Sequence, residues 1–215
     1  RSVQMGDVKP LFQPTATPTR FSSSFALEGD AQFTSGQLED IIDDDGNIIS
    51  TGAISAYLQA VKVDPNNAQV WAQLARVQTY SSAMLVNLEE RKARLEEALK
   101  SAEKAVELAP DDSYVHAIYA FTLDWNANSI LIDDPRVIQK LLTDAEQEAA
   151  RALQLDNTNT LALALSAEIL VDQQKWTPAQ QNIEKALASD SSLMDVHRVN
   201  AYVMESLGEY ALAIE

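Results

Sequence analysis

Apolar residues recur along most of the chain at intervals of three and four positions. In LEEALKSAEKAVELAP, one stripe is formed by Leu95, Ala98, Leu99, Ala102, Ala105 and Val106, and Pro110 follows it. An α-helix turns once every 3.6 residues, so this spacing places the apolar side chains on one helix face. Good helix formers dominate after residue 21, and the alternation of β-branched residues that indicates strands is absent. The pattern predicts an all-α chain.

Four segments of the chain carry the same helical pattern. They are AISAYLQAVKVDPNN, ALKSAEKAVELAPDD, AEQEAARALQLDNTN and AQQNIEKALASDSSL. Each has small residues at a fixed spacing and stops at Pro65, Pro110, Asn157 or Ser191, and a second apolar-periodic helix begins three residues later. Small residues let helices approach closely, and repeated helix pairs bury their apolar faces by stacking. The segments therefore predict a solenoid.

This pattern resembles the tetratricopeptide repeat (TPR), a 34-residue helix pair with a large residue at position 4 and small residues at positions 8, 20 and 27. We align position 32 of the repeat with the residues at which the four segments stop, Pro65, Pro110, Asn157 and Ser191. Position 4 then falls on Trp71, His116, Leu163 and His197, and position 8 falls on Ala75, Ala120, Ala167 and Ala201. The resemblance covers residues 22–215 and implies a right-handed superhelical solenoid of antiparallel helix pairs. Its repeats would span about 22–67, 68–112, 113–159, 160–193 and, incompletely, 194–215.

The first three repeats are longer than the family's unit. Their 11 to 13 extra residues lie between the first and the second helix, within GQLEDIIDDDGNIIS, YSSAMLVNLEERKARL and WNANSILIDDPRVI. Insertions at the same place in successive repeats lie on one face of a solenoid, and that face is often a binding face. We therefore expect three lobes side by side along one edge.

Residues 1–21 have a different composition. Pro10, Pro14 and Pro18 alternate with Thr15, Thr17 and Thr19. Proline fixes φ and removes a hydrogen-bond donor, so this segment is predicted to be an extended arm or linker. It would be either a tether or an arm that docks on a neighbouring subunit. Thr/Pro alternation is typical of extracytoplasmic stalks, which makes the three threonines candidate O-glycosylation sites.

Charge and cysteine content narrow the classes of function. The chain has 16 Lys and Arg against 32 Asp and Glu, a net charge of -16, and no cysteine. An acidic chain repels phosphate, which argues against nucleic acid and anionic membranes as partners. No apolar stretch is long enough to span a bilayer. The absence of cysteine, together with the Pro/Thr arm, favours an extracellular or cell-envelope location.

The sequence offers few residues for catalysis or for metal binding. His116 and His197 occupy the same packing position two repeats apart, and we find no nucleophile motif, phosphate loop or dinucleotide fingerprint. Asp43 and Asp45 precede Gly46 in an acidic run that is a weak calcium candidate, and a solvated turn is the alternative. The chain is therefore predicted to be non-enzymatic and without a cofactor.

The resemblance implies that the ligand surface is a concave groove lined by the first helices. The groove positions hold Gln69, Arg76, Thr79, Tyr80, Tyr114, Phe121, Asp124, Trp125, Glu168, Asp172, Asp195, Arg198 and Tyr202. Aromatic anchors suit capture of a peptide or a helix. The alternative for Tyr114, Phe121 and Trp125 is packing beneath the insertions. The paired Lys and Asn of the family's chaperone-tail clamp are missing here.

Two functions follow from this sequence, and both have a protein as the partner. The last helix is apolar on one side and has no polar cap, which predicts a scaffold that self-associates head-to-tail into a homo-oligomer or filament outside the cytoplasm. The alternative is a monomeric adaptor that binds a peptide or envelope-protein segment in the groove. A regulatory domain of a larger enzyme is a third interpretation.

Overall fold

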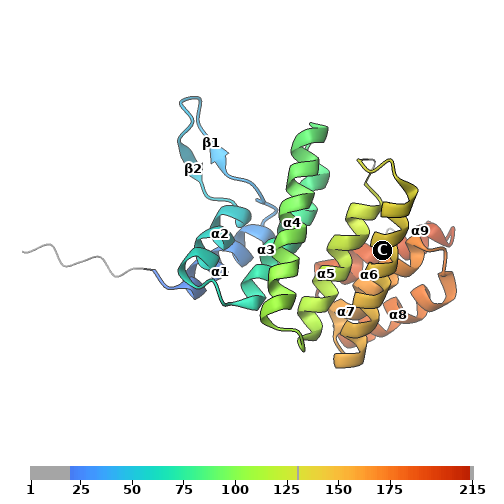
Figure 1. Ribbon diagram of the computed structural model, residues 1–215. Helices are drawn as coiled ribbons and strands as arrows, with labels where there is room; N and C mark the ends of the chain where they lie inside the picture. The colour runs from blue at the N-terminus through green and yellow to red at the C-terminus, as the bar shows by residue number, and fades with distance from the viewer. Residues whose placement is uncertain (1–19, 130, 214–215) are drawn as a thin grey trace, which may run out of the picture.

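The structure, a computed structural model, describes residues 20–129 and 131–213. Within these ranges, four antiparallel helix pairs and one further helix stack side by side (Figure 1). The helices are α1 (Ser22–Thr34), α2 (Ala53–Val63), α3 (Ala68–Met84), α4 (Leu88–Leu108), α5 (Ser113–Ala127), α6 (Pro135–Leu155), α7 (Thr160–Asp172), α8 (Trp176–Ser189) and α9 (Met194–Ser206). From α3 on, the first helix of each pair packs on the first helix of the next, and α2 joins the first pair to α3, so the core runs along the stack.

Short polar side chains determine where several helices begin. The side chains of Asn67, Asn87, Asp112, Asp134 and Asn159 each accept a hydrogen bond from a backbone N–H of the first helical turn. These N–H groups have no partner within the helix, so such a cap stabilises the helix by about 1 kcal/mol. Pro135 follows its cap at the first helical position, where its missing N–H costs nothing.

Small residues bring the helices of each pair together. Ala75, Ala120 and Ala167, at position 8 of their repeats, are fully buried. In the first repeat this position is Gly29, where a Cβ would lie 2.8 Å from the Tyr57 ring. A side chain larger than alanine at the three alanine positions, or any side chain at Gly29, would push the helices apart.

The large residue at position 4 has a second role. Ring nitrogens at this position hydrogen-bond the carbonyl oxygen six residues earlier, in the pairs Trp71–Pro65 (2.9 Å), His116–Pro110 (2.8 Å) and His197–Ser191 (2.5 Å). Each bond fastens the start of a repeat to the turn before it. His116 is buried and so has the packing role that its repeat position predicted, whereas His197 is exposed.

The extra residues of the first three repeats do not form three equivalent lobes. In the first repeat they form an antiparallel β-hairpin, β1 (Ile41–Ile42) and β2 (Ile48–Ser50), which an all-α prediction did not include. In the second they lengthen α3 and α4, and in the third they lengthen α6 and form the loop before it. The expected row of lobes is not confirmed. The hairpin itself follows from isoleucines flanking an Asp-Gly turn.

The predicted Pro/Thr arm lies outside the described residues apart from Arg20 and Phe21, and so do its candidate O-glycosylation sites Thr15, Thr17 and Thr19. Among the described helices, none is both long and apolar enough to cross a membrane.

Candidate functional site

The concave side of the stack is bridged in its middle by side chains from α3 and α9. Arg76 forms an ion pair with Asp195, which is fully buried, and the Tyr80 hydroxyl donates to the same carboxylate. Burial opposes the charge of Arg76, but Asp195 together with Tyr114 and Tyr80 raises the arginine pKa. The predicted groove is therefore filled at this level by the protein's own side chains.

A second arginine of α9 strengthens the bridge. Both terminal nitrogens of Arg198 donate to Glu168, at 2.7 and 2.6 Å, and its Nε donates to the Tyr80 hydroxyl at 3.0 Å. Burial disfavours the Arg198 charge, but the Glu168 carboxylate more than compensates and raises its pKa. Trp125 donates its indole N–H to Glu168 at 3.1 Å, so this carboxylate is fully neutralised and hydrogen-bonded.

Aromatic rings from three helices fill the space between the two bridges. The Tyr80 ring lies 5.8 Å from that of Phe33, 5.2 Å from Phe121 and 5.5 Å from Trp125, measured between centroids. Such pairs add about 1 kcal/mol each beyond the area that they bury. The guanidinium of Arg198 lies over Tyr80, Phe121 and Trp125, at 5.3 to 5.9 Å. The cluster thus packs the concave side of the stack. Trp125 also lies beside Ser82 and Arg91, which belong to the second inserted segment.

Two further carboxyl groups lie next to this cluster. Asp172 accepts a hydrogen bond from Asn128 at 2.7 Å and another from the Tyr202 hydroxyl. Asp124 is only 1% exposed, and neither of its carboxyl oxygens has a hydrogen-bond donor among the described residues. Burial and the neighbouring Asp172 raise the Asp124 pKa well above the value of an ordinary aspartate. Asp124 therefore keeps its proton to higher pH than an ordinary aspartate does.

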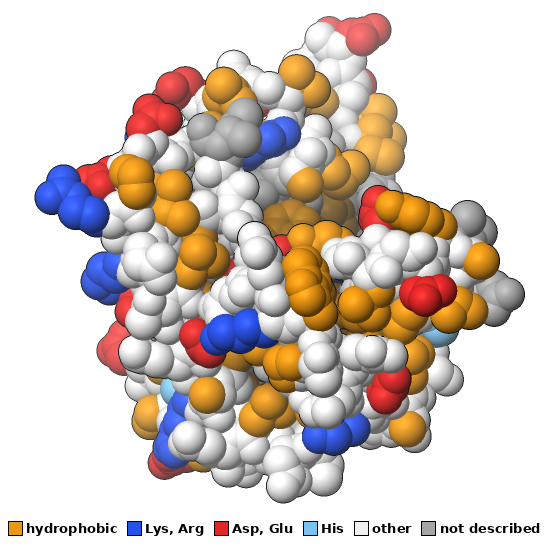
Figure 2. All heavy atoms as spheres, turned by 90° about the vertical axis from the view of Figure 1, so that its right-hand side faces the viewer, with side chains coloured by type: hydrophobic (Ala, Val, Ile, Leu, Met, Phe, Trp, Pro, Cys, Tyr) orange, Lys and Arg blue, Asp and Glu red, His pale blue; other side chains and the backbone are white. Residues whose placement is uncertain are grey.

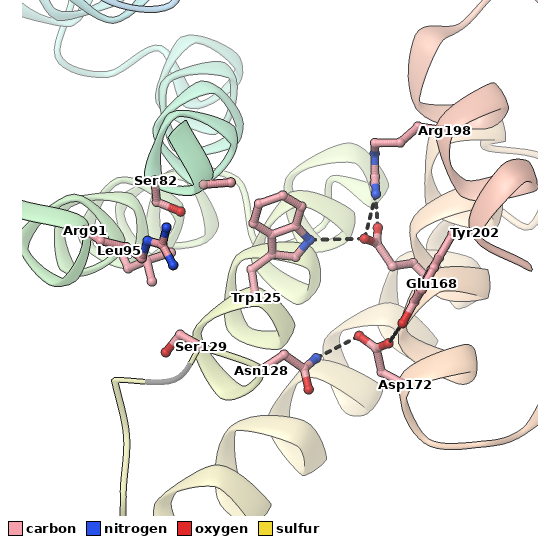
Figure 3. A pocket seen from close by; sticks show the side chains of 11 residues that line it. Ser82, Arg91, Leu95, Trp125, Asn128, Ser129, Glu168, Asp172, Arg198 and Tyr202 are labelled. Carbon is pink, nitrogen blue, oxygen red and sulfur yellow. Dashed lines mark hydrogen bonds and ion pairs between the residues drawn. The ribbon is translucent and has the colours of Figure 1, made fainter. Parts of the chain in front are cut away.

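A cavity of about 400 Å³ opens beside these residues. Figure 3 shows Trp125 between two walls, with Glu168, Asp172, Arg198 and Tyr202 on one side and Arg91 and Leu95 on the other. The lining residues that groove positions predicted are Trp125, Glu168, Asp172, Arg198 and Tyr202. Those that they did not predict are Ser82, Ala83, Arg91, Leu95, Asn128 and Ser129. The cavity thus combines a carboxylate-bearing wall with apolar and aromatic side chains.

Several predicted groove residues lie elsewhere. Gln69 is exposed and donates to Asp112 at 2.6 Å, away from the cavity. Thr79 shares a hydrogen bond with Thr122 of α5, 3.2 Å away, inside the core. Tyr114 is packed against the core, and its hydroxyl has no hydrogen-bond partner among the described residues. Thr79 and Tyr114 therefore contribute packing, and Gln69 lies on the surface away from the cavity.

Sequence reasoning missed Phe33 and Arg91. Phe33 stands at position 12 of the first repeat, so the groove positions applied to that repeat would have found it. Its ring lies 4.6 Å from the guanidinium of Arg76. Arg91 comes from the residues that lengthen α4, which have no counterpart in a 34-residue repeat. No repeat position could have placed it at the cavity.

The weak calcium candidate is part of the hairpin turn. The Asp43 carboxylate accepts hydrogen bonds from the backbone N–H groups of Asp45, at 3.0 Å, and Asn47, at 2.8 Å. The Asn47 bonds lower the Asp43 pKa. Within the part of the chain that the structure describes, no three His, Cys, Asp or Glu side chains come together in a group that could hold a metal ion.

Comparisons with known proteins identify the fold. No curated protein matches the sequence. The family model described as "Regulator of microtubule dynamics protein 1-3" matches residues 39–132, less than half of the chain. TTC0263, a thermophilic TPR protein of Thermus thermophilus, is 13% identical over 90% of this chain and 86% of its own, with a TM-score of 0.68.

Two further solved structures are similar at lower scores. The human IFIT1 dimer with PPP-AAAA is 15% identical over 89% of this chain and 48% of its own, with a TM-score of 0.51. The MamA protein is 18% identical over 90% of this chain and 86% of its own, with a TM-score of 0.43. The likeness to TTC0263 shows that the chain has the fold of a right-handed superhelical TPR-like solenoid of antiparallel helix pairs.

Proposed function

We propose that the protein is a non-enzymatic scaffold that binds a partner protein at the cavity between α4, α5, α7 and α9. The observation that carries this proposal is the bridge between Arg76 and Asp195. Because it fills the middle of the concave side, a partner helix cannot lie along the groove as the resemblance implied. The cavity of about 400 Å³ beside the bridge is the part of this side that is left for a ligand.

The chemistry of the lining suits a side chain of a partner protein. Trp125, Tyr202 and Leu95 offer aromatic and apolar surface, and Ser129 and Asn128 offer polar groups at the border. Sites of this kind hold one anchoring side chain in a pocket while the rest of the peptide lies over the rim. A short segment of the partner is therefore the proposed occupant.

Site-specific photo-crosslinking tests this proposal. A photoreactive amino acid replaces Ser129 at the cavity or, as the control, Lys185, an exposed residue of α8. In an extract of the source cells, the cavity position is expected to crosslink one partner that the α8 position does not, and mass spectrometry identifies it. The same crosslinks from both positions, or none from Ser129, would contradict the proposal.

Self-association head-to-tail is the second candidate, and exposed apolar residues at both ends of the stack favour it. At the α1 end, Phe21 is 76% and Leu27 is 68% exposed, and beyond α9 Tyr210 is 65% exposed. Figure 2 looks onto the side of the molecule that carries the later helices, where hydrophobic side chains gather between charged ones. Contact between two different surfaces generates a ring or a filament.

Light scattering after size exclusion tests the second candidate. The net charge of -16 opposes association at low salt, so assemblies are expected to grow as salt screens the repulsion. Leu27→Asp is expected to abolish the assemblies. A charge introduced at Ala93, an exposed position of α4, is the control and is expected to leave them unchanged. A monomer at all salt concentrations would reject this candidate. An extracellular or envelope location is part of the same proposal, and fractionation of the source cells tests it.

A further inference from the structure

We propose that the cavity binds an arginine or lysine side chain of the partner, with Asp172 as its counter-ion. This inference rests on the proposed function of the cavity and adds the chemistry of its ligand. It follows from which charges around the cavity are already paired and which are not.

Among the described residues that line the cavity, one carboxylate has no cationic partner. Glu168 is held by both terminal nitrogens of Arg198 and by the indole of Trp125. Asp172 also lines the cavity, but its donors are two neutral groups, the amide of Asn128 and the hydroxyl of Tyr202. Across the described ranges, no Lys or Arg forms an ion pair with it.

A second carboxyl group, that of Asp124, is buried next to Asp172. Asp124 is 1% exposed, and neither of its oxygens has a donor in residues 20–129 and 131–213. A buried polar group without a partner is costly, and two neighbouring carboxylates cannot both ionise cheaply. Burial keeps the proton on Asp124 to higher pH, and Asp172 is the member of the pair that lines the cavity. Asp172 is therefore the carboxyl group that a bound cation would meet.

The side chains around Asp172 fit a long basic side chain. Trp125 and Tyr202 offer aromatic faces, on which a guanidinium or ammonium group is stabilised, and Leu95 offers apolar surface to the methylene stem. The protein uses the same combination internally. Arg198 binds Glu168 while its guanidinium lies 5.9 Å from the Trp125 ring.

The two arginines of the cavity do not exclude this ligand. Arg198 is neutralised by Glu168. Arg91 lies on the opposite wall, donates to the Leu85 carbonyl oxygen at 2.9 Å, and has an Nε without a partner among the described residues. A backbone carbonyl of the bound segment would accept from this nitrogen after a small side-chain shift. An anionic ligand would instead face Asp172, and the chain's net charge of -16 also favours a basic partner.

Small neutral and charged isosteres test the inference without reference to the natural partner. N-acetylarginine amide, N-acetyllysine amide and N-acetylcitrulline amide are titrated into the whole protein, and the indole N–H signal of Trp125 is followed by nuclear magnetic resonance. The arginine and lysine probes are expected to bind at least about tenfold more tightly than citrulline, because only they pair with the carboxylate. Equal binding of citrulline would overturn the inference.

A matched pair of variants shows which carboxylate is responsible. Asp172→Asn is expected to lower the affinity for the arginine probe about tenfold. Glu205→Gln removes the same charge from an exposed position of α9 and is expected to change this affinity by less than about twofold. Equal affinity of the two variants would overturn the inference. The citrulline comparison on the unmodified protein stays decisive even where Asp172→Asn fails to fold.

The two proposals fail separately. A partner crosslinked from Ser129, together with equal binding of citrulline and arginine probes, would keep the proposed function and reject the basic ligand. Specific binding of the arginine probe without any crosslinked partner would keep the ligand chemistry and reject the scaffold function.

Discussion

Arg76 of α3 and Asp195 of α9 lie 119 positions apart in the sequence and form a buried ion pair. Between them the chain passes through α5 and α7, so the pair joins the second repeat directly to the fifth. Neighbouring repeats of a solenoid normally contact only each other. This ion pair therefore fixes the curvature of the stack in a way that local packing alone does not.

Breaking this ion pair is expected to be costly. Arg76 is 12% and Asp195 1% exposed at their side chains, so Arg76→Gln leaves a buried carboxylate without a counter-ion. We expect the free energy of unfolding to fall by about 3–5 kcal/mol in urea denaturation. The control is Lys140→Gln, which breaks an exposed pair with Asp144 and is expected to cost less than about 1 kcal/mol.

The corresponding double variant separates the pair from its surroundings. Arg76→Gln with Asp195→Asn removes both charges, so it is expected to recover part of the stability that the single change loses. Strictly additive losses would show that the two side chains do not interact across the concave side.

Much of the solenoid could be predicted from the sequence because its determinants are local. The apolar spacing, the small residue at Ala75 and its equivalents, and the caps such as Asp134 each act within one helix or between adjacent helices. The hairpin was missed because its strands have only two and three residues, too few for an alternating pattern. The Asp-Gly turn between the isoleucines was the available signal.

The candidate site could be predicted only in part, because superhelix curvature brings distant repeats together. Repeat positions identified Tyr80, Arg198 and Glu168 as residues of the concave side. They could not show that Arg198 reaches Tyr80, 118 positions away, and closes the groove. Such a contact depends on the summed angles between successive repeats. The same curvature leaves a bounded cavity where the resemblance implied an open groove.

Two glycines are expected to resist substitution to different degrees. A Cβ at Gly29 would lie 2.8 Å from the Tyr57 ring, whereas one at Gly52 would lie 2.3 Å from the backbone carbon of Glu39. A ring can shift but the backbone cannot do so cheaply. Gly29→Ala is expected to lower the free energy of unfolding by about 1–3 kcal/mol, partly offset by about 1 kcal/mol of helix propensity.

Gly52→Ala should cost more than Gly29→Ala in the same denaturation experiment. Ala31→Gly, at an exposed position of α1, measures separately how much the helix propensity of alanine over glycine contributes to the free energy of unfolding. A stabilising Gly29→Ala would contradict the close packing of α1 on α2.

The isoleucines of the hairpin are expected to be dispensable for folding. Ile42 is 60%, Ile48 59% and Ile49 66% exposed. Changing all three to threonine keeps β-branched side chains and removes exposed apolar surface, so the free energy of unfolding should change by less than about 0.5 kcal/mol per site. Ile54→Thr, at a buried position of α2, is the control and should be clearly destabilising. A comparable loss at the hairpin would show that it packs against the rest of the protein.

The buried Asp124 is expected to make stability fall as pH rises. Its pKa in the folded protein lies well above the ordinary value of 3.8, because of burial and then of Asp172. Between those two values the folded state binds more protons than the unfolded state, so stability decreases with pH through this window. Asp124→Asn removes this titration and keeps a side chain of nearly the same size and shape.

The variant and the unmodified protein should therefore differ little near about pH 4 and diverge toward about pH 8, where Asp124→Asn is the more stable. Urea denaturation across this range measures the difference. The exposed aspartates with lowered pKa values, such as Asp43 and Asp190, act in the opposite direction but only below the ordinary value of 3.8. They do not obscure the effect at higher pH. Asp44→Asn, at an exposed position of the hairpin turn, is the control. A parallel pH profile for both variants would show that Asp124 is already ionised in the folded protein.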